Sequence, residues 1–191
     1  HAGVAVVHQE LQLVPELAVA ENLRLGRFPT SGGVINFRHM FEDVGARLRD
    51  IGIATDPCEK VARLSIGERQ MIEIAKAVMI DARIIALDEP TSSLSSRESE
   101  ILFKLIERLK AEGKIILYIS HRLDEIFRLC DGCTVLRDGK LAAHHDSLKE
   151  ISRDQLVAEM VGREIADIWG WHPRDIGEPR LVVDHLSGER L

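Results

Sequence analysis

A short apolar run that ends in two carboxylates constrains this chain more than any other feature. Residues 84–87 have the composition of a buried strand, and Asp88 and Glu89 follow them directly. In open parallel α/β sheets, ligands bind beyond the carboxyl ends of the strands, so both acids would lie at a ligand site. The alternative is a strand that merely runs into an acidic turn, and the flanking segments must decide between the two.

A helix with a defined start precedes this strand. Ser65 and Glu68 fit the S-x-x-E capping box, and apolar residues then recur at helical spacing up to Met79. The start of a helix offers unpaired N–H groups and a partial positive charge, which together bind anions. An ordinary capped helix explains Ser65 and Glu68. It does not explain Gly67, which lowers helix propensity but would let a phosphate approach the backbone.

A second strand and a histidine follow the acidic pair. Residues 114–119 have the pattern of a buried strand, and His121 comes two positions later. Between the strands, residues 96–112 show helical spacing, which Gly113 ends. A strand, a helix and a strand form a parallel crossover, so we expect His121 near Glu89 at one edge of the sheet. A lone histidine after a strand is more often a surface residue, but this position favours a functional one.

Several motifs, in this order along the chain, resemble those of ATP-binding-cassette (ABC) ATPases. Residues 6–10 are similar to the Q-loop, residues 64–68 to the signature motif and residues 84–89 to the Walker B strand. Residues 92–95 resemble the D-loop, and His121 resembles the switch histidine. The resemblance covers nearly the whole chain.

The resemblance implies an α/β fold: a P-loop NTPase-type (RecA-like) core with an inserted α-helical subdomain at about residues 18–80. Asn36 would cap one helix of that subdomain. Residues 1–164 would be the C-terminal part of a first ABC ATPase domain, residues 165–178 a linker and residues 179–191 the start of a second such domain. The G-x-x-x-x-G-K-[ST] phosphate loop (Walker A) is absent from the sequence. We therefore expect a fragment, truncated at the N-terminus and inactive by itself.

The resemblance also implies roles for single residues. Glu89 would act on the attacking water, and His121 would contact the γ-phosphate of ATP. Asp88 and Gln9 would serve Mg²⁺. Ser65, Ile66 and Gly67 would serve the γ-phosphate bound by the opposite cassette, and the other implied cofactor-binding positions are Glu68 and Ser95. Ser95 replaces the aspartate that many cassettes have in the D-loop, although its hydroxyl can still donate or accept a hydrogen bond.

The finer resemblance is to the tandem ATPase subunits of bacterial monosaccharide importers of the ribose, galactose, xylose and arabinose type. Ile66 replaces the second glycine of most signatures, and residues 120–126 and 160–164 are similar to this group. This implies an ATP hydrolase, peripheral on the cytoplasmic face of the cell membrane, that drives carbohydrate uptake. The implied partners are transmembrane permease subunits, a second ABC cassette and, indirectly, a periplasmic sugar-binding protein. No residue reports which sugar is carried.

Composition limits the other classes of function. The chain of 191 residues is 45% hydrophobic and can bury a core, and its net charge of −6 argues against nucleic acid as a partner. Cys130 and Cys133 form a C-x-x-C, but Cys58 stands alone, so no second pair completes a zinc site. We favour a helix end at Cys130 and a strand start at Cys133.

Two local signals complete the coarse organisation of the chain. Residues 137–140 carry a two-residue hairpin signal, and Ser152 with Gln155 opens another capped helix.

Two further functions fit the motifs that resemble those of ABC ATPases. A non-transport cassette ATPase of translation or DNA repair would carry a basic arm or a long coiled coil, which this sequence lacks. A catalytically inactive cassette remnant would fit the missing phosphate loop. We favour the importer.

Overall fold

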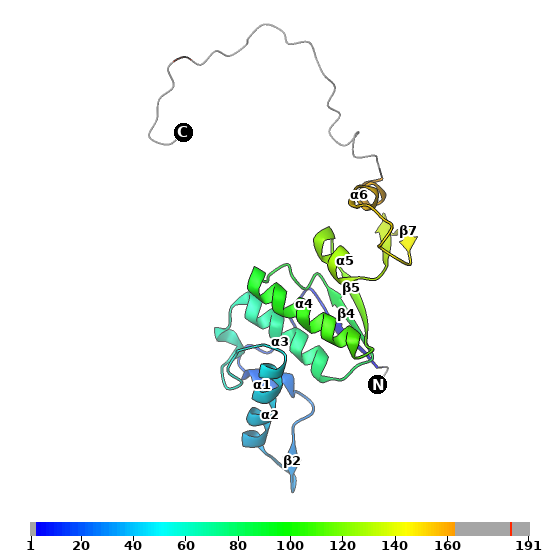
Figure 1. Ribbon diagram of the computed structural model, residues 1–191. Helices are drawn as coiled ribbons and strands as arrows, with labels where there is room; N and C mark the ends of the chain where they lie inside the picture. Colours follow the sequence, from blue (N-terminus) through cyan, green and yellow to red (C-terminus); the bar gives the residue numbers. More distant parts are fainter. Residues whose placement is uncertain (1–2, 163–183, 185–191) are drawn as a thin grey trace, which may run out of the picture. The chain divides into compact units, whose positions relative to one another are not determined.

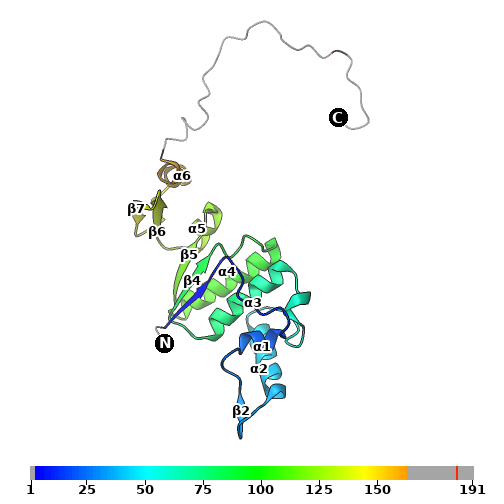
Figure 2. The same cartoon turned by 180° about the vertical axis from the view of Figure 1, so that it is seen from behind.

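The computed structural model describes residues 3–162 and residue 184 (Figures 1 and 2). The chain divides into two compact units: the first holds His1–Cys133 and His145–Leu148, and the second holds Thr134–His144 and Lys149–Leu191. All the predicted site residues belong to the first unit. The predicted linker at 165–178 and the predicted start of a second domain lie outside the described residues, apart from Asp184.

A parallel sheet in the order β1-β4-β5 forms the centre of the first unit. Its strands are β1 (Val4–Val7), β4 (Ile84–Asp88) and β5 (Ile115–Ile119). Leu87 is level with Val7 on one side and with Tyr118 on the other, and both pairings are parallel. The carboxyl ends of the three strands therefore share one edge. The predicted parallel crossover is confirmed, because α4 (Ser96–Ala111) connects β4 to β5.

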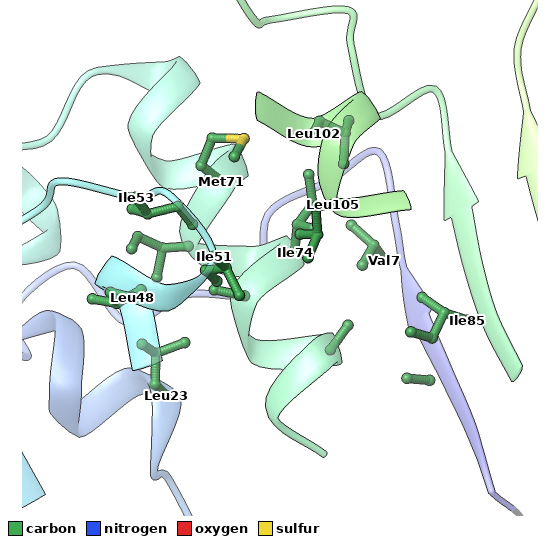
Figure 3. Close-up of a cluster of buried hydrophobic side chains, with 14 of the residues drawn as sticks. Val7, Leu23, Leu48, Ile51, Ile53, Met71, Ile74, Ile85, Leu102 and Leu105 are labelled. Carbon is green, nitrogen blue, oxygen red and sulfur yellow. The ribbon is translucent and has the colours of Figure 1, made fainter. Parts of the chain in front are cut away.

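Two amphipathic helices cover one face of this sheet. The side chains of Val7 and Ile85 lie with Ile74 of α3 (Ile66–Met79) and Leu105 of α4 in the core cluster (Figure 3). On the other face of the sheet, apolar side chains that alternate with the buried ones are 46–56% exposed: Val4, Val6, Ile115, Leu117 and Ile119. Parallel sheets are normally covered on both faces, so this open apolar face is unusual.

The predicted helical section consists of α1 (Val19–Leu23), α2 (Phe37–Asp50), a 3-10 turn η1 (Val61–Arg63) and α3. Asn36 caps α2 as predicted, because its side-chain oxygen accepts a hydrogen bond from the His39 N–H at 3.1 Å. A small hairpin of β2 (Thr30–Ser31) and β3 (Val34–Ile35) lies between the helices α1 and α2. This hairpin was not predicted from the sequence. Its turn is made by Gly32 and Gly33, both at positive φ.

The remaining elements are α5 (Leu123–Leu129), β6 (Cys133–Arg137), β7 (Lys140–His145) and α6 (Arg153–Val161). Asp138 and Gly139 join β6 to β7 at φ values of 53° and 71°, which confirms the predicted two-residue hairpin. The Ser152 hydroxyl accepts a hydrogen bond from the Gln155 N–H at 3.1 Å, as its predicted capping role requires. Within the described residues, no helix is both long enough and apolar enough to cross a bilayer.

Candidate functional site

Three predicted site residues follow the carboxyl ends of the three sheet strands. Gln9 lies two positions beyond β1, Asp88 is the last residue of β4, and His121 lies two positions beyond β5. Because these strands are parallel neighbours in the order β1-β4-β5, the three residues lie along one edge of the sheet. This edge is where open α/β sheets bind ligands.

The structure brings Glu89 and His121 into direct contact. Nδ1 of His121 lies 3.0 Å from Oε1 of Glu89, which makes these two side chains the centre of the candidate site. The Glu89 N–H donates to the Ile119 carbonyl at 2.9 Å, and Glu89 adopts a φ of 44°, which is uncommon for a residue with a side chain. Backbone strain of this kind is concentrated at functional sites. The side chains of His121 and Glu89 are 70% and 31% exposed, so a ligand can reach both.

Asp88 and Gln9 bring two side-chain oxygen donors to this edge of the sheet. Within the described part of the chain, neither side chain makes a hydrogen bond or an ion pair. Carboxylate and amide oxygens suit Mg²⁺, which keeps several waters and is usually shared with substrate phosphates. No group of three or more His, Cys, Asp or Glu among the described residues could hold a metal ion. A carboxylate and an amide oxygen are donors that suit a Mg²⁺ ion shared with a phosphate ligand.

The signature segment begins α3 with the predicted capping box. The Ser65 hydroxyl accepts a hydrogen bond from the Glu68 N–H at 3.2 Å, and the Glu68 carboxylate accepts the Ser65 N–H at 2.8 Å. Ile66 at the first helical position is 65% exposed. In the described residues, no hydrogen bond or ion pair joins positions 65–68 to Asp88, Glu89 or His121. Among the described residues, the structure therefore does not bring the start of α3 into hydrogen-bond contact with the Glu89–His121 pair.

Ser95, at the D-loop position, caps α4 in the same way. Its N–H and hydroxyl donate to Oε2 of Glu98 at 2.8 Å and 2.6 Å, and its hydroxyl accepts the Glu98 N–H at 3.3 Å. The hydroxyl at this position therefore both donates and accepts hydrogen bonds, and both belong to the cap of its own helix.

Gly67 brings the starts of α3 and α4 close together. A Cβ atom on Gly67 would lie 2.8 Å from both carboxylate oxygens of Glu98, which is closer than real contacts allow. From the sequence, the one reason for a glycine at this position was that it lets a phosphate approach the backbone. The structure adds a second reason, because the Glu98 carboxylate that caps α4 passes over the α-carbon of Gly67.

Sequence reasoning missed the residues that hold the segment after Gln9. The side chain of Asn22, only 1% exposed, accepts from the Val14 N–H at 2.7 Å and donates to the Val14 carbonyl at 3.0 Å. The Lys76 ammonium of α3 donates to the Gln12 carbonyl at 3.2 Å. The burial of Asn22 could have been predicted, because this residue places a polar side chain on the apolar face of a short helix.

A buried acid, Glu125 on α5, was also missed. It is 4% exposed and accepts hydrogen bonds from Thr91 and Tyr118 at 2.8 Å and 2.7 Å. Its spacing from Leu129 places it on the apolar face of α5, which could have indicated burial. Elsewhere in the first unit, Cys130 is a free thiol, and burial raises its pKa, which favours the protonated form.

Both the sequence and the fold of this chain resemble those of known proteins. Residues 1–92 match the family model described as "ABC transporter". The "Arabinose import ATP-binding protein AraG" of Rhizobium etli is 69% identical over all 191 residues, and that of Rhizobium johnstonii is 70% identical over the same length. A protein of the same name from Ralstonia nicotianae is 55% identical over 190 residues. The chain spans 38% of the length of the two Rhizobium relatives.

Two solved structures show the same fold. One is a dimeric post-hydrolysis state of an ATP-binding cassette bound to ADP and Pi, with a TM-score of 0.65 and 22% identity over 78% of this chain and 64% of that one. The other is a nucleotide-free ATP-binding cassette from an ABC transporter, with a TM-score of 0.64 and 23% identity over 92% and 69% of the two chains. The predicted α/β cassette fold is thereby confirmed.

Proposed function

We propose that this chain forms part of the ATP-binding subunit of a monosaccharide importer of the ABC transporter family, because residues 1–92 match that family's model and a Rhizobium relative is 69% identical across the chain. The proposal concerns the full-length protein, since the chain spans 38% of its Rhizobium relatives. Arabinose is the proposed sugar, because relatives that are 55–70% identical across this chain are named for arabinose import. The observation that carries the ATPase assignment is the contact between Glu89 and His121 at the ligand-binding edge of the sheet.

In the proposed reaction, Glu89 orients and polarises the water that attacks the γ-phosphate of ATP. Its carboxylate is partly exposed and close to the end of β4, so a water molecule can reach it. His121 holds the γ-phosphate through the ring nitrogen that does not face Glu89, since Nδ1 lies against the carboxylate. Holding the ring in this way fixes the side that it presents to the phosphate.

Asp88 and Gln9 would hold Mg²⁺ together with the nucleotide. When bound, the ion neutralises negative charge that develops on the phosphates during transfer. Asp88 offers a carboxylate at the end of β4, and Gln9 offers an amide oxygen from the neighbouring strand end. Asn22 of α1 and Lys76 of α3 hold the segment after Gln9 through hydrogen bonds to its backbone. A shift of Gln9 would therefore also move the helices to which this segment is bonded.

The start of α3 would serve a nucleotide held mainly by a second cassette. Ile66 is exposed there, and the helix start offers N–H groups to an anion. The proposed partners are a second ABC cassette, transmembrane permease subunits and, indirectly, a periplasmic sugar-binding protein. The proposed location is the cytoplasmic face of the cell membrane, as a peripheral subunit.

An uptake assay in a strain that lacks the gene tests this function. Uptake of labelled arabinose, ribose, galactose and xylose would be measured before and after complementation with the full-length gene. We expect the wild-type gene to restore arabinose uptake and Glu89→Gln to leave it absent at equal expression. The matched control is Glu100→Gln, which changes an exposed acid on α4 that pairs with Arg128. Undiminished arabinose uptake in the deletion strain, or full uptake with Glu89→Gln, would contradict the proposal.

A further inference from the structure

Glu125 is a buried acid that the proposed hydrolysis scheme does not use. It lies in the first turn of α5 and is 4% exposed, beside the buried Ile126 and Leu129. A carboxylate removed from water destabilises a protein unless hydrogen bonds and opposite charges compensate for the lost hydration. The partners of Glu125 therefore indicate which parts of the molecule its burial holds together.

Four side chains surround this carboxylate. Thr91 donates to Oε1 at 2.8 Å, and Tyr118 donates to Oε2 at 2.7 Å. Ser120 donates to Oε2 at 3.3 Å, and Arg122 forms an ion pair with Oε1 at 2.9 Å. Burial, and next the hydrogen bond to Glu125, raise the pKa of Tyr118 above its usual range, so the phenol remains a donor. Both carboxylate oxygens are thus fully engaged.

These partners flank the two residues of the candidate site. Thr91 follows Glu89 by two positions, and Ser120 and Arg122 lie on either side of His121. The Arg122 N–H also donates to the Ser120 hydroxyl at 3.0 Å, which closes the loop around the histidine. A single buried carboxylate therefore ties the turn after β4 to the loop after β5.

The contact between Glu89 and His121 needs such support. Both side chains are open to solvent, and ion pairs between exposed side chains contribute little stability by themselves. The 3.0 Å separation must therefore be set by the two backbones. The Glu89 N–H donates a hydrogen bond to the Ile119 carbonyl, which fixes the backbone of Glu89 at the strand end. The hydrogen bonds and the ion pair of Glu125 fix the turn after β4 and the loop after β5.

We propose that Glu125 is a positioning residue for ATP hydrolysis, which holds the Glu89 carboxylate and the His121 imidazole in register; this rests on the proposed function. Glu125 contacts neither nucleotide nor attacking water in this account. It acts through Thr91 on one side and through Ser120 and Arg122 on the other. Misplacing a reacting group by about 1 Å can slow a reaction about 100-fold, so loss of this support should lower turnover without weakening nucleotide binding.

The test compares three variants of the full-length protein: Glu125→Gln, Thr91→Val and the control Glu100→Gln. Glu100 also ties α5 to α4, through Arg128 at 2.7 Å and 2.8 Å. Among the described residues, no hydrogen bond or ion pair joins Glu100 to Glu125 or its partners. We expect Glu125→Gln to lower kcat about 10- to 100-fold, with KM for ATP within about twofold of wild type. Thr91→Val removes one donor and should lower kcat less, while Glu100→Gln should leave both constants unchanged.

A crystal structure of Glu125→Gln gives a second readout, in which we expect Nδ1 of His121 and Oε1 of Glu89 to lie beyond hydrogen-bond distance. A lower Tm with wild-type kcat and an intact contact would show a purely structural role and overturn the inference. A raised KM with unchanged kcat would overturn it as well. If Glu125→Gln does not fold, an unchanged kcat in Thr91→Val overturns it. Absent turnover in the wild-type protein would instead contradict the proposed function, and the crystallographic distance would still decide the positioning role.

Discussion

Nδ1 of His121 lies 3.0 Å from Oε1 of Glu89, although the two residues are 32 positions apart in the sequence. The contact joins the ends of the adjacent parallel strands β4 and β5, at the edge where this class of sheet binds ligands. It brings a carboxylate and an imidazole together at that edge, and the proposed hydrolysis depends on it.

His121→Ala in the full-length protein should lower ATP turnover about 100-fold, because a fixed donor to the reacting phosphate would be lost. ATP binding should change little, since the proposed scheme gives His121 a contact with the γ-phosphate alone. Steady-state kinetics and equilibrium ATP binding measure the two effects separately. His39→Ala is the matched control, because His39 lies exposed on α2. Equal turnover in the His121 and His39 variants would remove His121 from the site.

Ser95→Ala should destabilise the start of α4, because Ser95 caps that helix. Loss of such a cap costs about 1 kcal/mol, which corresponds to a Tm decrease of about 2–4 °C for a domain of this size. Thermal unfolding of the full-length protein measures it. Ser96→Ala, one position along at the start of the same helix, should leave the Tm unchanged. Equal shifts in both variants would show that the Ser95 cap is not the cause.

Gly67→Ala should behave differently in two backgrounds. In the wild-type protein the new methyl group must displace the Glu98 carboxylate, 2.8 Å from its position, and so disrupt the cap of α4. In a Glu98→Ala background the same change should stabilise the helix by about 0.5–1 kcal/mol, the usual gain of alanine over glycine. A double-mutant cycle of unfolding free energies measures the coupling, for which we expect about 1 kcal/mol. Additive effects would contradict the contact.

The open apolar face of the sheet should make the isolated 191-residue chain associate with itself. Leu117 lies in the middle of this face and is 55% exposed. Contiguous exposed apolar patches promote association, so Leu117→Lys should reduce the associated fraction and the binding of a hydrophobic dye. Leu136→Lys is the control, because Leu136 is 72% exposed on β6, outside this sheet. Analytical ultracentrifugation that finds the unmodified chain monomeric would refute this prediction.

Much of the fold follows from local rules that the sequence displays. The strand before Asp88, the capping boxes at Ser65 and Ser95 and the hairpin turn at Asp138 each depend on residues within a few positions of one another. The pairing of β4 with β5 follows because a helix of suitable length separates them. The β2–β3 hairpin was missed because its strands have only two residues each, too few to show an alternating pattern.

The site was only partly accessible from the sequence. Topology alone placed His121 beside Glu89, since both follow neighbouring parallel strands. Glu125 could not be found in that way, because its partner Thr91 lies 34 positions away and only the packing of the two loops brings these side chains together. The approach of Glu98 to Gly67 likewise depends on how two helices pack. The roles proposed for residues 65–68 require a second cassette, which no property of one chain can display.

The most direct test of the account is ATP binding and turnover by the full-length Glu89→Gln variant. The amide keeps the size of the side chain but can no longer accept a proton from the attacking water. We predict that ATP binds as in the wild-type protein, while turnover at this site falls about 10²- to 10⁴-fold. Unchanged turnover with normal ATP binding would contradict the account, because Glu89 would then have no part in hydrolysis.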